Sequence, residues 1–146
     1  MNAPGSRDPE AMAADSRRVI DDEHRQLRKL LATIDETADA VAMVPLLREL
    51  QALLVEHFEH EDSEGGLPIM VAGRAPHLMP ALDGLKHEHE VFLTDVTVLI
   101  DQARRANDVN AVRTAFRDLR DRLHDHESRE TDLIIEAFER DFGGGD

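Results

Sequence analysis

The chain has 146 residues, enough for one domain, and its aromatic side chains are limited to five Phe, so Leu, Val, Ile and Ala must form the core. That composition favours helices over a β-sandwich. A formal charge of −14 repels phosphate groups, so we expect neither nucleic acid nor a membrane as a partner. The absence of Cys excludes disulfides and thiolate chemistry, and without a signal peptide or membrane span the expected location is cytoplasmic.

The first predicted helix follows a Pro- and Gly-containing segment, residues 1–14, which we interpret as a mobile N-terminal tail. Asp15 or Ser16 can cap a helix that runs to about Ala38. Its apolar stripe consists of Ile20, His24, Leu27, Leu31 and Ile34, spaced three or four residues apart. His24 is therefore predicted to face the core.

The second predicted helix begins near Pro45, a residue suited to a first helical position, and ends before Gly65 and Gly66. Its stripe consists of Leu46, Leu50, Leu53, Leu54, His57 and Glu61. Since His57 and Glu61 are four residues apart, they lie one turn apart on the inward face.

A loop over residues 65–80 precedes the third predicted helix, which starts at Pro80; packing is a simpler role for this loop than a lid over a site. Asp108 can cap the fourth helix, and residues 141–146 form a frayed C-terminus. The third stripe is Leu85, His89, Phe92, Val96, Leu99 and Ala103, and the fourth is Val112, Phe116, Leu119, Leu123, His126, Glu130 and Leu133.

The four stripes contain an internal repeat. The first and third helices share the pattern E-H-x-x-[LF] from Glu23 and Glu88, and the second and fourth share L-x-x-x-L-x-x-H-x-x-x-E. Two similar hairpins predict an all-α fold, an antiparallel up-down-up-down four-helix bundle.

The depth of each histidine places these side chains in one layer of the bundle. His24 lies about 12 Å from its helix start at 1.5 Å per residue, and the corresponding estimates bring His57, His89 and His126 to a similar level. Any one of these residues alone is better explained as a hydrogen-bonded core residue or a surface ion pair. Agreement in face, depth and repeat among His24, His57, Glu61, His89, His126 and Glu130 instead favours a metal site, because a cation binds neutral imidazole and carboxylate together.

The number of donors indicates two metals. Six protein ligands exceed what one tetrahedral zinc binds, and carboxylates on two helices can bridge a pair of ions. Two six-coordinate ions need about twelve bonds; the protein supplies eight, and a bridging oxide or hydroxide supplies two. About one open position per metal then remains for something small. Ferritin-like Glu-x-x-His, zincin H-E-x-x-H, P-loop, nucleophile-elbow and G-x-G-x-x-G motifs are absent.

The order His, H-x-x-x-E, His, H-x-x-x-E, with Glu-His pairs in the first and third helices, resembles the hemerythrin-like (HHE cation-binding) family over residues 15–140. The resemblance implies a hemerythrin-like four-helix domain and two non-haem iron ions. The implied terminal ligands are His24, His57, His89 and His126, with Glu61 and Glu130 as bridges. The chain departs from the oxygen carriers, which have a second His four residues from the first on helix 3 and H-x-x-x-x-D on helix 4.

Three functional hypotheses follow. The first is binding, sensing or reduction of dioxygen, peroxide or nitric oxide at the di-iron site, which leaves open whether the protein is an enzyme. The second is an iron-responsive regulatory or iron-storage bundle, and the third is a helical scaffold with no functional metal or with adventitious zinc. The sequence also leaves open the oligomeric state and whether His60, His87, His124 or Glu127 adds a ligand.

Overall fold

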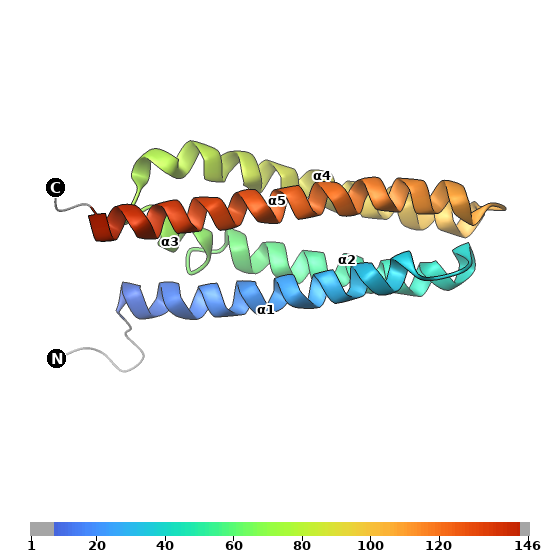
Figure 1. The fold of residues 1–146 in the computed structure, drawn as a ribbon, viewed down its shortest axis with the longest axis horizontal. Coiled ribbons are helices and arrows are strands. Elements are labelled where there is room, and N and C mark those ends of the chain that lie inside the picture. Colours follow the sequence, from blue (N-terminus) through green and yellow to red (C-terminus); the bar gives the residue numbers. More distant parts are fainter. Residues whose placement is uncertain (1–7, 144–146) are drawn as a thin grey trace.

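Four long helices form the computed structural model, which describes residues 8–143 (Figure 1). They are α1 Pro9–Asp35, α2 Ala40–Asp62, α4 Met79–Arg105 and α5 Val109–Gly143. Successive long helices run in opposite directions, and no strand occurs between residues 8 and 143. The predicted all-α, up-down-up-down bundle is therefore confirmed.

Helix α1 begins at Pro9, six residues before the predicted cap at Asp15. Asp8 is the cap, because its side chain accepts a hydrogen bond from the backbone N–H of Glu10, and Pro9 occupies a first-turn position that needs no intrahelical N–H partner. Ala13 is buried, which anchors this added turn to the bundle. The predicted tail thus loses its last six residues to the helix, and residues 1–7 lie outside the described part of the chain.

Helix α2 also begins earlier than predicted. Asp39 caps it by accepting a hydrogen bond from the backbone N–H of Ala42 at 2.8 Å, so Pro45 lies inside the helix instead of at its start. Proline removes only the hydrogen bond to the carbonyl of Val41, a residue that is exposed, where water can replace the missing donor.

The chain turns sharply after α2. A Cβ atom at Gly66 would lie 2.0 Å from the carbonyl oxygen of His60 and 2.7 Å from that of Glu61, closer than any side chain permits. Gly66 therefore lets the connection pack directly against the last turn of α2. That turn carries Glu61, one of the predicted ligands.

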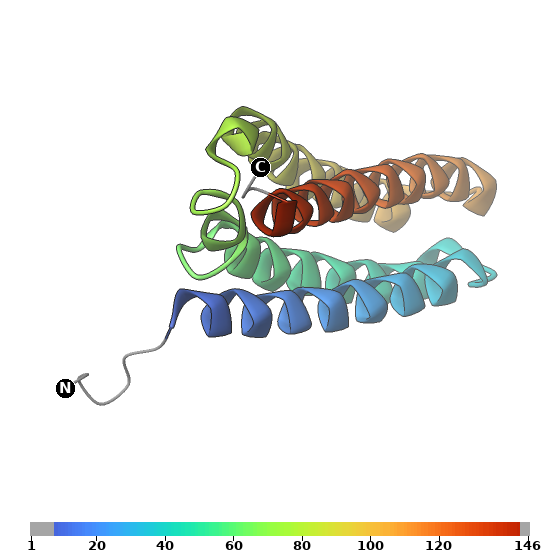
Figure 2. The same cartoon turned by 60° about the vertical axis from the view of Figure 1, so that its left-hand side comes forward.

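The connection over residues 65–80 closes one end of the bundle (Figure 2). It contains the short helix α3, Leu67–Val71, and a 3-10 turn, Pro76–Leu78. Leu67, Met70 and Val71 are buried in an apolar cluster with residues of α1, α4 and α5. The expected packing role of this loop is confirmed. At the other terminus α5 continues to Gly143, into the segment predicted to fray, and residues 144–146 lie outside the described part.

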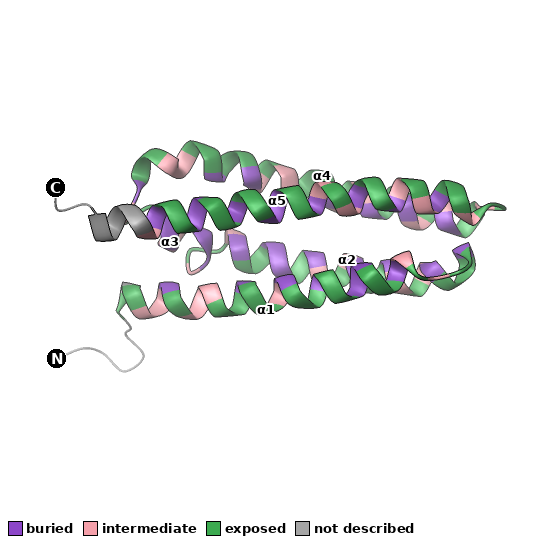
Figure 3. Ribbon diagram, in the orientation of Figure 1, coloured by how far each residue is buried: buried purple, intermediate pink, exposed green. Residues whose placement is uncertain are grey.

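The buried faces of the long helices form the core (Figure 3), which consists of two apolar clusters and a set of buried polar residues. The larger cluster includes Leu31, Leu50 and Phe116, and the smaller includes Ile20 and Leu82. Of the four neighbouring pairs of long helices, α1 and α5 are the most loosely packed. No helix between residues 8 and 143 combines the length and apolar character needed to cross a membrane.

Candidate metal centre

All six predicted ligands meet in the polar layer between the two apolar clusters. Helix α1 supplies His24, α2 supplies His57 and Glu61, α4 supplies His89, and α5 supplies His126 and Glu130. None of the six is more than 5% exposed, and both glutamates are fully buried. The helical stripes bring them together because each side chain replaces an apolar residue on the inward face of its helix.

The six side chains form two groups that share their carboxylates. One group is His24, His57, Glu61 and Glu130, and the other is His89, His126, Glu61 and Glu130. In each group one ligand atom per residue lies within 4.8 Å of all the others. Two pairs of imidazoles thus flank the same two carboxylates, an arrangement typical of a carboxylate-bridged pair of metals.

In the first group the imidazole nitrogens point at both carboxylates. His24 Nε2 lies 3.6 Å from a Glu61 oxygen and 3.7 Å from a Glu130 oxygen, and His57 Nε2 lies 3.2 Å from the other Glu61 oxygen. The ligand atoms of this group, one from each residue, lie within 4.8 Å of one another, which is close enough for them to surround one cation.

The second group repeats this geometry. His89 Nε2 lies 3.3 Å from Glu61 Oε1 and 3.9 Å from Glu130 Oε2, and His126 Nε2 lies 3.4 Å from Glu130 Oε1. The Nε2 atoms of His89 and His126 are only 3.1 Å apart. With both Nδ1 atoms facing carboxylates, two lone pairs confront one another, and a cation between them removes the repulsion.

Several buried polar atoms of the layer have no hydrogen-bond partner among the described residues. They are Nε2 of His24 and of His57, and both carboxylate oxygens of Glu61 and of Glu130. Buried polar groups are normally paired, because desolvation without a partner is costly. The donor set of imidazole nitrogens and carboxylate oxygens therefore fits bound metal, as the family resemblance predicts.

Three of the four histidines are oriented by a second carboxylate. Nδ1 of His57 donates to Glu23 at 3.0 Å, and Nδ1 of His89 donates to Asp62 at 3.0 Å. These contacts keep the proton on Nδ1 and leave the Nε2 lone pair for the metal, a common support for metal-binding histidines.

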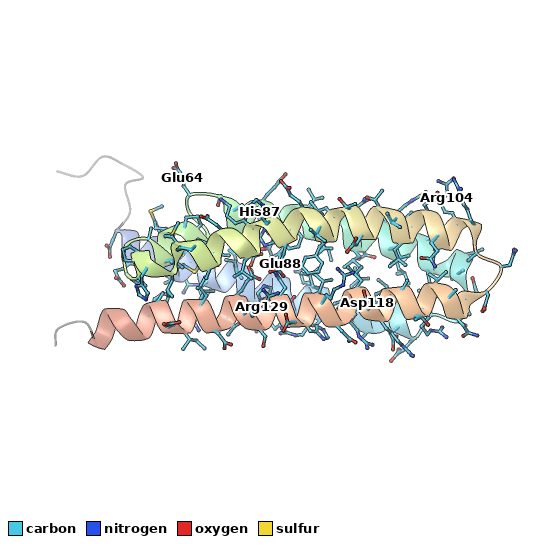
Figure 4. All side chains as sticks on the ribbon, turned by 90° about the horizontal axis from the view of Figure 1, so that it is seen from above. Glu64, His87, Glu88, Arg104, Asp118 and Arg129 are labelled. Carbon is cyan, nitrogen blue, oxygen red and sulfur yellow. The ribbon has the colours of Figure 1, made fainter. Side chains whose placement is uncertain are left out.

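The third such contact joins His126 Nδ1 to Glu88 at 3.3 Å. Glu88 is itself held by Arg129 through two further hydrogen bonds, one of them 2.6 Å long, and the two residues face each other between α4 and α5 (Figure 4). The hydrogen bonds from Arg129 outweigh the effect of burial, which opposes ionisation, and lower the pKa of Glu88 below its usual range.

Sequence reasoning missed the supporting roles of Glu23, Asp62 and Glu88. The signal was present in the Glu-His pair that opens both halves of the repeat. Each glutamate of these pairs contacts the histidine of the next helix, His57 or His126, instead of the histidine beside it in sequence. Only the packing of the helices shows this exchange.

Without metal, the pKa values of the two shared carboxyls are shifted in opposite directions. Burial raises the pKa of Glu130 well above its usual range, and the neighbouring Glu61 carboxylate raises it further. Burial also opposes ionisation of Glu61, but the neighbouring Glu130 carboxyl and the imidazoles of His24, His57 and His89 hold its pKa well below its usual range. Without metal, Glu130 thus keeps its proton at a pH where Glu61 is ionised.

The pKa values of His57 and of His126, which occupy corresponding positions on α2 and α5, are also shifted in opposite directions. Burial lowers the pKa of His57, but the Glu23 hydrogen bond and the nearby Glu61 carboxylate outweigh it and raise the pKa to about 9. Burial lowers the pKa of His126 to about 4, and the nearby His89 contributes to that decrease.

The remaining candidate residues lie outside the six. His87 and His124 are exposed. His60 is also exposed, and its Nδ1 lies 2.7 Å from Glu23 Oε2, so it supports Glu23. Glu127 is buried beside the layer and lies 3.6 Å from Arg28.

Comparison with known proteins gave one match. The family model described as the Hemerythrin HHE cation binding domain matches residues 15–141. Neither the curated proteins nor the solved structures that were compared with the chain gave a match.

Proposed function

The chain belongs to the hemerythrin HHE cation-binding domain family, and on this premise we propose that it is a non-haem di-iron protein that binds, senses or reduces a small oxidant. The observation that carries the proposal is the pair of histidine groups sharing two buried carboxylates. The proposed ligands are His24 and His57 for one ion, His89 and His126 for the other, and Glu61 and Glu130 as bridges.

The donor set favours iron over the alternatives. A single tetrahedral zinc would use four of the six ligands and leave buried donors unpaired, whereas imidazole and carboxylate together suit ferrous and ferric iron. We therefore propose two iron ions joined by an oxo or hydroxo bridge. Bound iron supplies reversible one-electron chemistry and open positions for dioxygen, peroxide or nitric oxide.

The chain's own residues perform three tasks in this proposal. The four imidazoles and two carboxylates hold the metal pair, and Glu23, Asp62 and Glu88 keep three imidazole rings in register. The apolar clusters on either side exclude bulk water from the layer. The missing second histidine on α4, where Leu85 and Leu93 flank His89, favours reactivity over stable oxygen carriage.

A regulatory or storage role is the second candidate. It is supported by the unpaired atoms of the polar layer, because a fold with such a layer depends on its metal for stability. Iron occupancy would then change the stability of the bundle and so report iron availability.

Rapid mixing of the reduced, iron-loaded protein with air or with hydrogen peroxide tests the first candidate against the second. We expect oxidation by peroxide to be faster than formation of any lasting oxygen adduct. The absorption of the ferric pair monitors this oxidation. A long-lived, reversible oxygen adduct combined with inertness toward peroxide would restore the carrier function. Inertness toward peroxide, dioxygen and nitric oxide alike would leave the regulatory or storage role.

A further inference from the structure

The internal repeat pairs each residue in one half of the metal centre with a residue in the other half. Glu23 and His24 of α1 correspond to Glu88 and His89 of α4. By the same pattern, the α2 residues His57, Phe58, Glu61 and Asp62 correspond to the α5 residues His126, Glu127, Glu130 and Thr131. Every contact made in one half thus has a counterpart position in the other.

Around His57 and His126 the two halves agree. His57 Nδ1 contacts Glu23, which His60 holds from the other side, and the corresponding set in the second half is His126, Glu88 and Arg129. The third position is His60 in one half and Arg129 in the other, and both contact the supporting carboxylate.

Around His24 and His89 the halves differ. The His89 ring is fixed twice, since Phe58 stacks on it at 4.0 Å with an interplanar angle of 7° and Asp62 accepts from its Nδ1 at 3.0 Å. The residues in the corresponding places beside His24 are Glu127 and Thr131. Neither Phe nor Asp is present there, and no described residue forms a hydrogen bond with His24 Nδ1.

A cavity lies where the repeat is broken. Its volume is about 280 Å³, and it opens between α1 and α5, the most loosely packed neighbours in the bundle. The seven residues that line it all carry polar side chains: His24, Arg28, His124, Glu127, Ser128, Thr131 and Asp132. Glu127 lies deep in its wall, with only a tenth of its side chain exposed, 3.6 Å from Arg28.

These differences give His24 a freedom that His89 lacks. A supporting carboxylate fixes the orientation of a metal-bound imidazole, and a stacked ring blocks its rotation. The His24 ring has neither support: the His57 ring meets it edge-on at 4.7 Å, and the cavity adjoins its other side. It is therefore the proposed ligand ring that borders open space, and it separates the cavity from the centre.

We propose that the cavity behind His24 is the pocket through which a small polar oxidant of the hydrogen peroxide class enters the centre, with the His24 ring as its inner wall. The inference rests on the di-iron function proposed above and narrows it to a substrate class. The hydroxyl, carboxylate, imidazole and guanidinium groups of the wall offer hydrogen bonds that peroxide can donate and accept and that apolar diatomic gases cannot use.

The test introduces beside His24 the carboxylate and the stacked ring that support His89 in the other half. Thr131→Asp places a carboxylate where Asp62 stands in the other half, and the double variant Glu127→Phe/Thr131→Asp also restores the stacked ring. Thr114→Asp is the matched control, because Thr114 is an exposed residue of the same helix far from the cavity. Ser128→Leu fills the cavity from an exposed position without touching either restored contact.

Two readouts are compared at equal iron content. The first is the rate at which azide, a redox-inert polar probe, binds the ferric protein, and the second is the rate of oxidation by hydrogen peroxide. We expect both rates to fall by about tenfold or more in Thr131→Asp, in the double variant and in Ser128→Leu, because access is gated at this pocket. Nitric oxide binding is expected to change less than the azide rate, and Thr114→Asp is expected to behave as the parent protein.

Unchanged azide and peroxide rates in Ser128→Leu and in the Thr131 variants would refute the proposal that this cavity is the entrance to the centre. Equal slowing of nitric oxide and peroxide would overturn the preference for a polar oxidant. Failure of the parent protein to retain iron would instead refute the di-iron function, so the two failures are distinguishable.

Discussion

Replacing Glu130 by Met is expected to stabilise the metal-free protein while it destroys the metal site. The carboxyl of Glu130 is fully buried, and neither of its oxygens has a hydrogen-bond partner among the described residues. Methionine has a similar length and needs no partner. A residue kept for structure would show the opposite effect, so the variant separates a metal ligand from a structural polar residue.

The magnitude follows from the cost of the unpaired carboxyl. A buried polar group without a partner costs about 1–3 kcal/mol, so removing it should raise the free energy of unfolding of the metal-free chain by about that amount. For a domain of this size each kcal/mol corresponds to about 2–4 °C, which gives an increase in Tm of roughly 2–12 °C. The increase should grow with pH, because burial raises the pKa of Glu130 and ionisation destabilises the fold.

The assay is urea and thermal unfolding, followed by circular dichroism, after exhaustive chelation. Glu59→Met is the matched control, since Glu59 is exposed on α2 and the residue types exchanged are the same. We expect that control to stay within about 0.5 kcal/mol of the parent protein. A lower stability of metal-free Glu130→Met, or retention of two irons by this variant, would refute the reasoning.

Three further predictions concern the ligands and their supports. His89→Ala should lose iron while His87→Ala keeps it, because only His89 faces the buried layer; metal analysis that gives the reverse would show that α4 is rotated. Glu88→Ala should weaken iron retention about 10–100-fold in a chelator competition, since it orients His126; unchanged retention would contradict this role. Metal uptake at pH 7 should release the proton of His57, whose pKa is about 9, so affinity rises toward that pH. The same shift stabilises the metal-free fold fully below about pH 6.5, and this stabilisation is lost as the pH rises through about 9. The difference in Tm between metal-loaded and metal-free protein should therefore widen over that range, and a constant difference would count against the assignment.

The bundle and the six central residues could be predicted because each depends on helical periodicity. His24, His57, His89 and His126 replace apolar residues in stripes that only an inward-facing helix produces, and the repeat fixes their common depth. A pattern of this kind can be recognised in the sequence without knowledge of the tertiary structure.

Helix starts were harder to predict, because several neighbouring residues are each able to cap or to begin a helix. Pro45 suggested a boundary, yet it lies inside α2, where Asp39 had already begun the helix, and Pro9, which was placed in the predicted tail, opens α1. The alternative caps Asp15 and Ser16 are equally good by residue type.

The support of the centre and its cavity depend on tertiary contacts. That Glu23 serves His57 rather than the adjacent His24 follows only from the packing of α1 on α2. The place of Thr131 opposite His24 likewise becomes visible only when the two halves of the bundle are compared.

Native mass spectrometry of the freshly purified protein tests the central proposal most directly, because it counts the metals bound to each intact chain. Two iron ions per folded chain are predicted, with loss of at least one from Glu61→Ala and with both retained in Glu64→Ala, whose exposed carboxylate lies outside the centre. One zinc ion per chain, or a folded chain that binds no metal, would contradict the proposed di-iron centre.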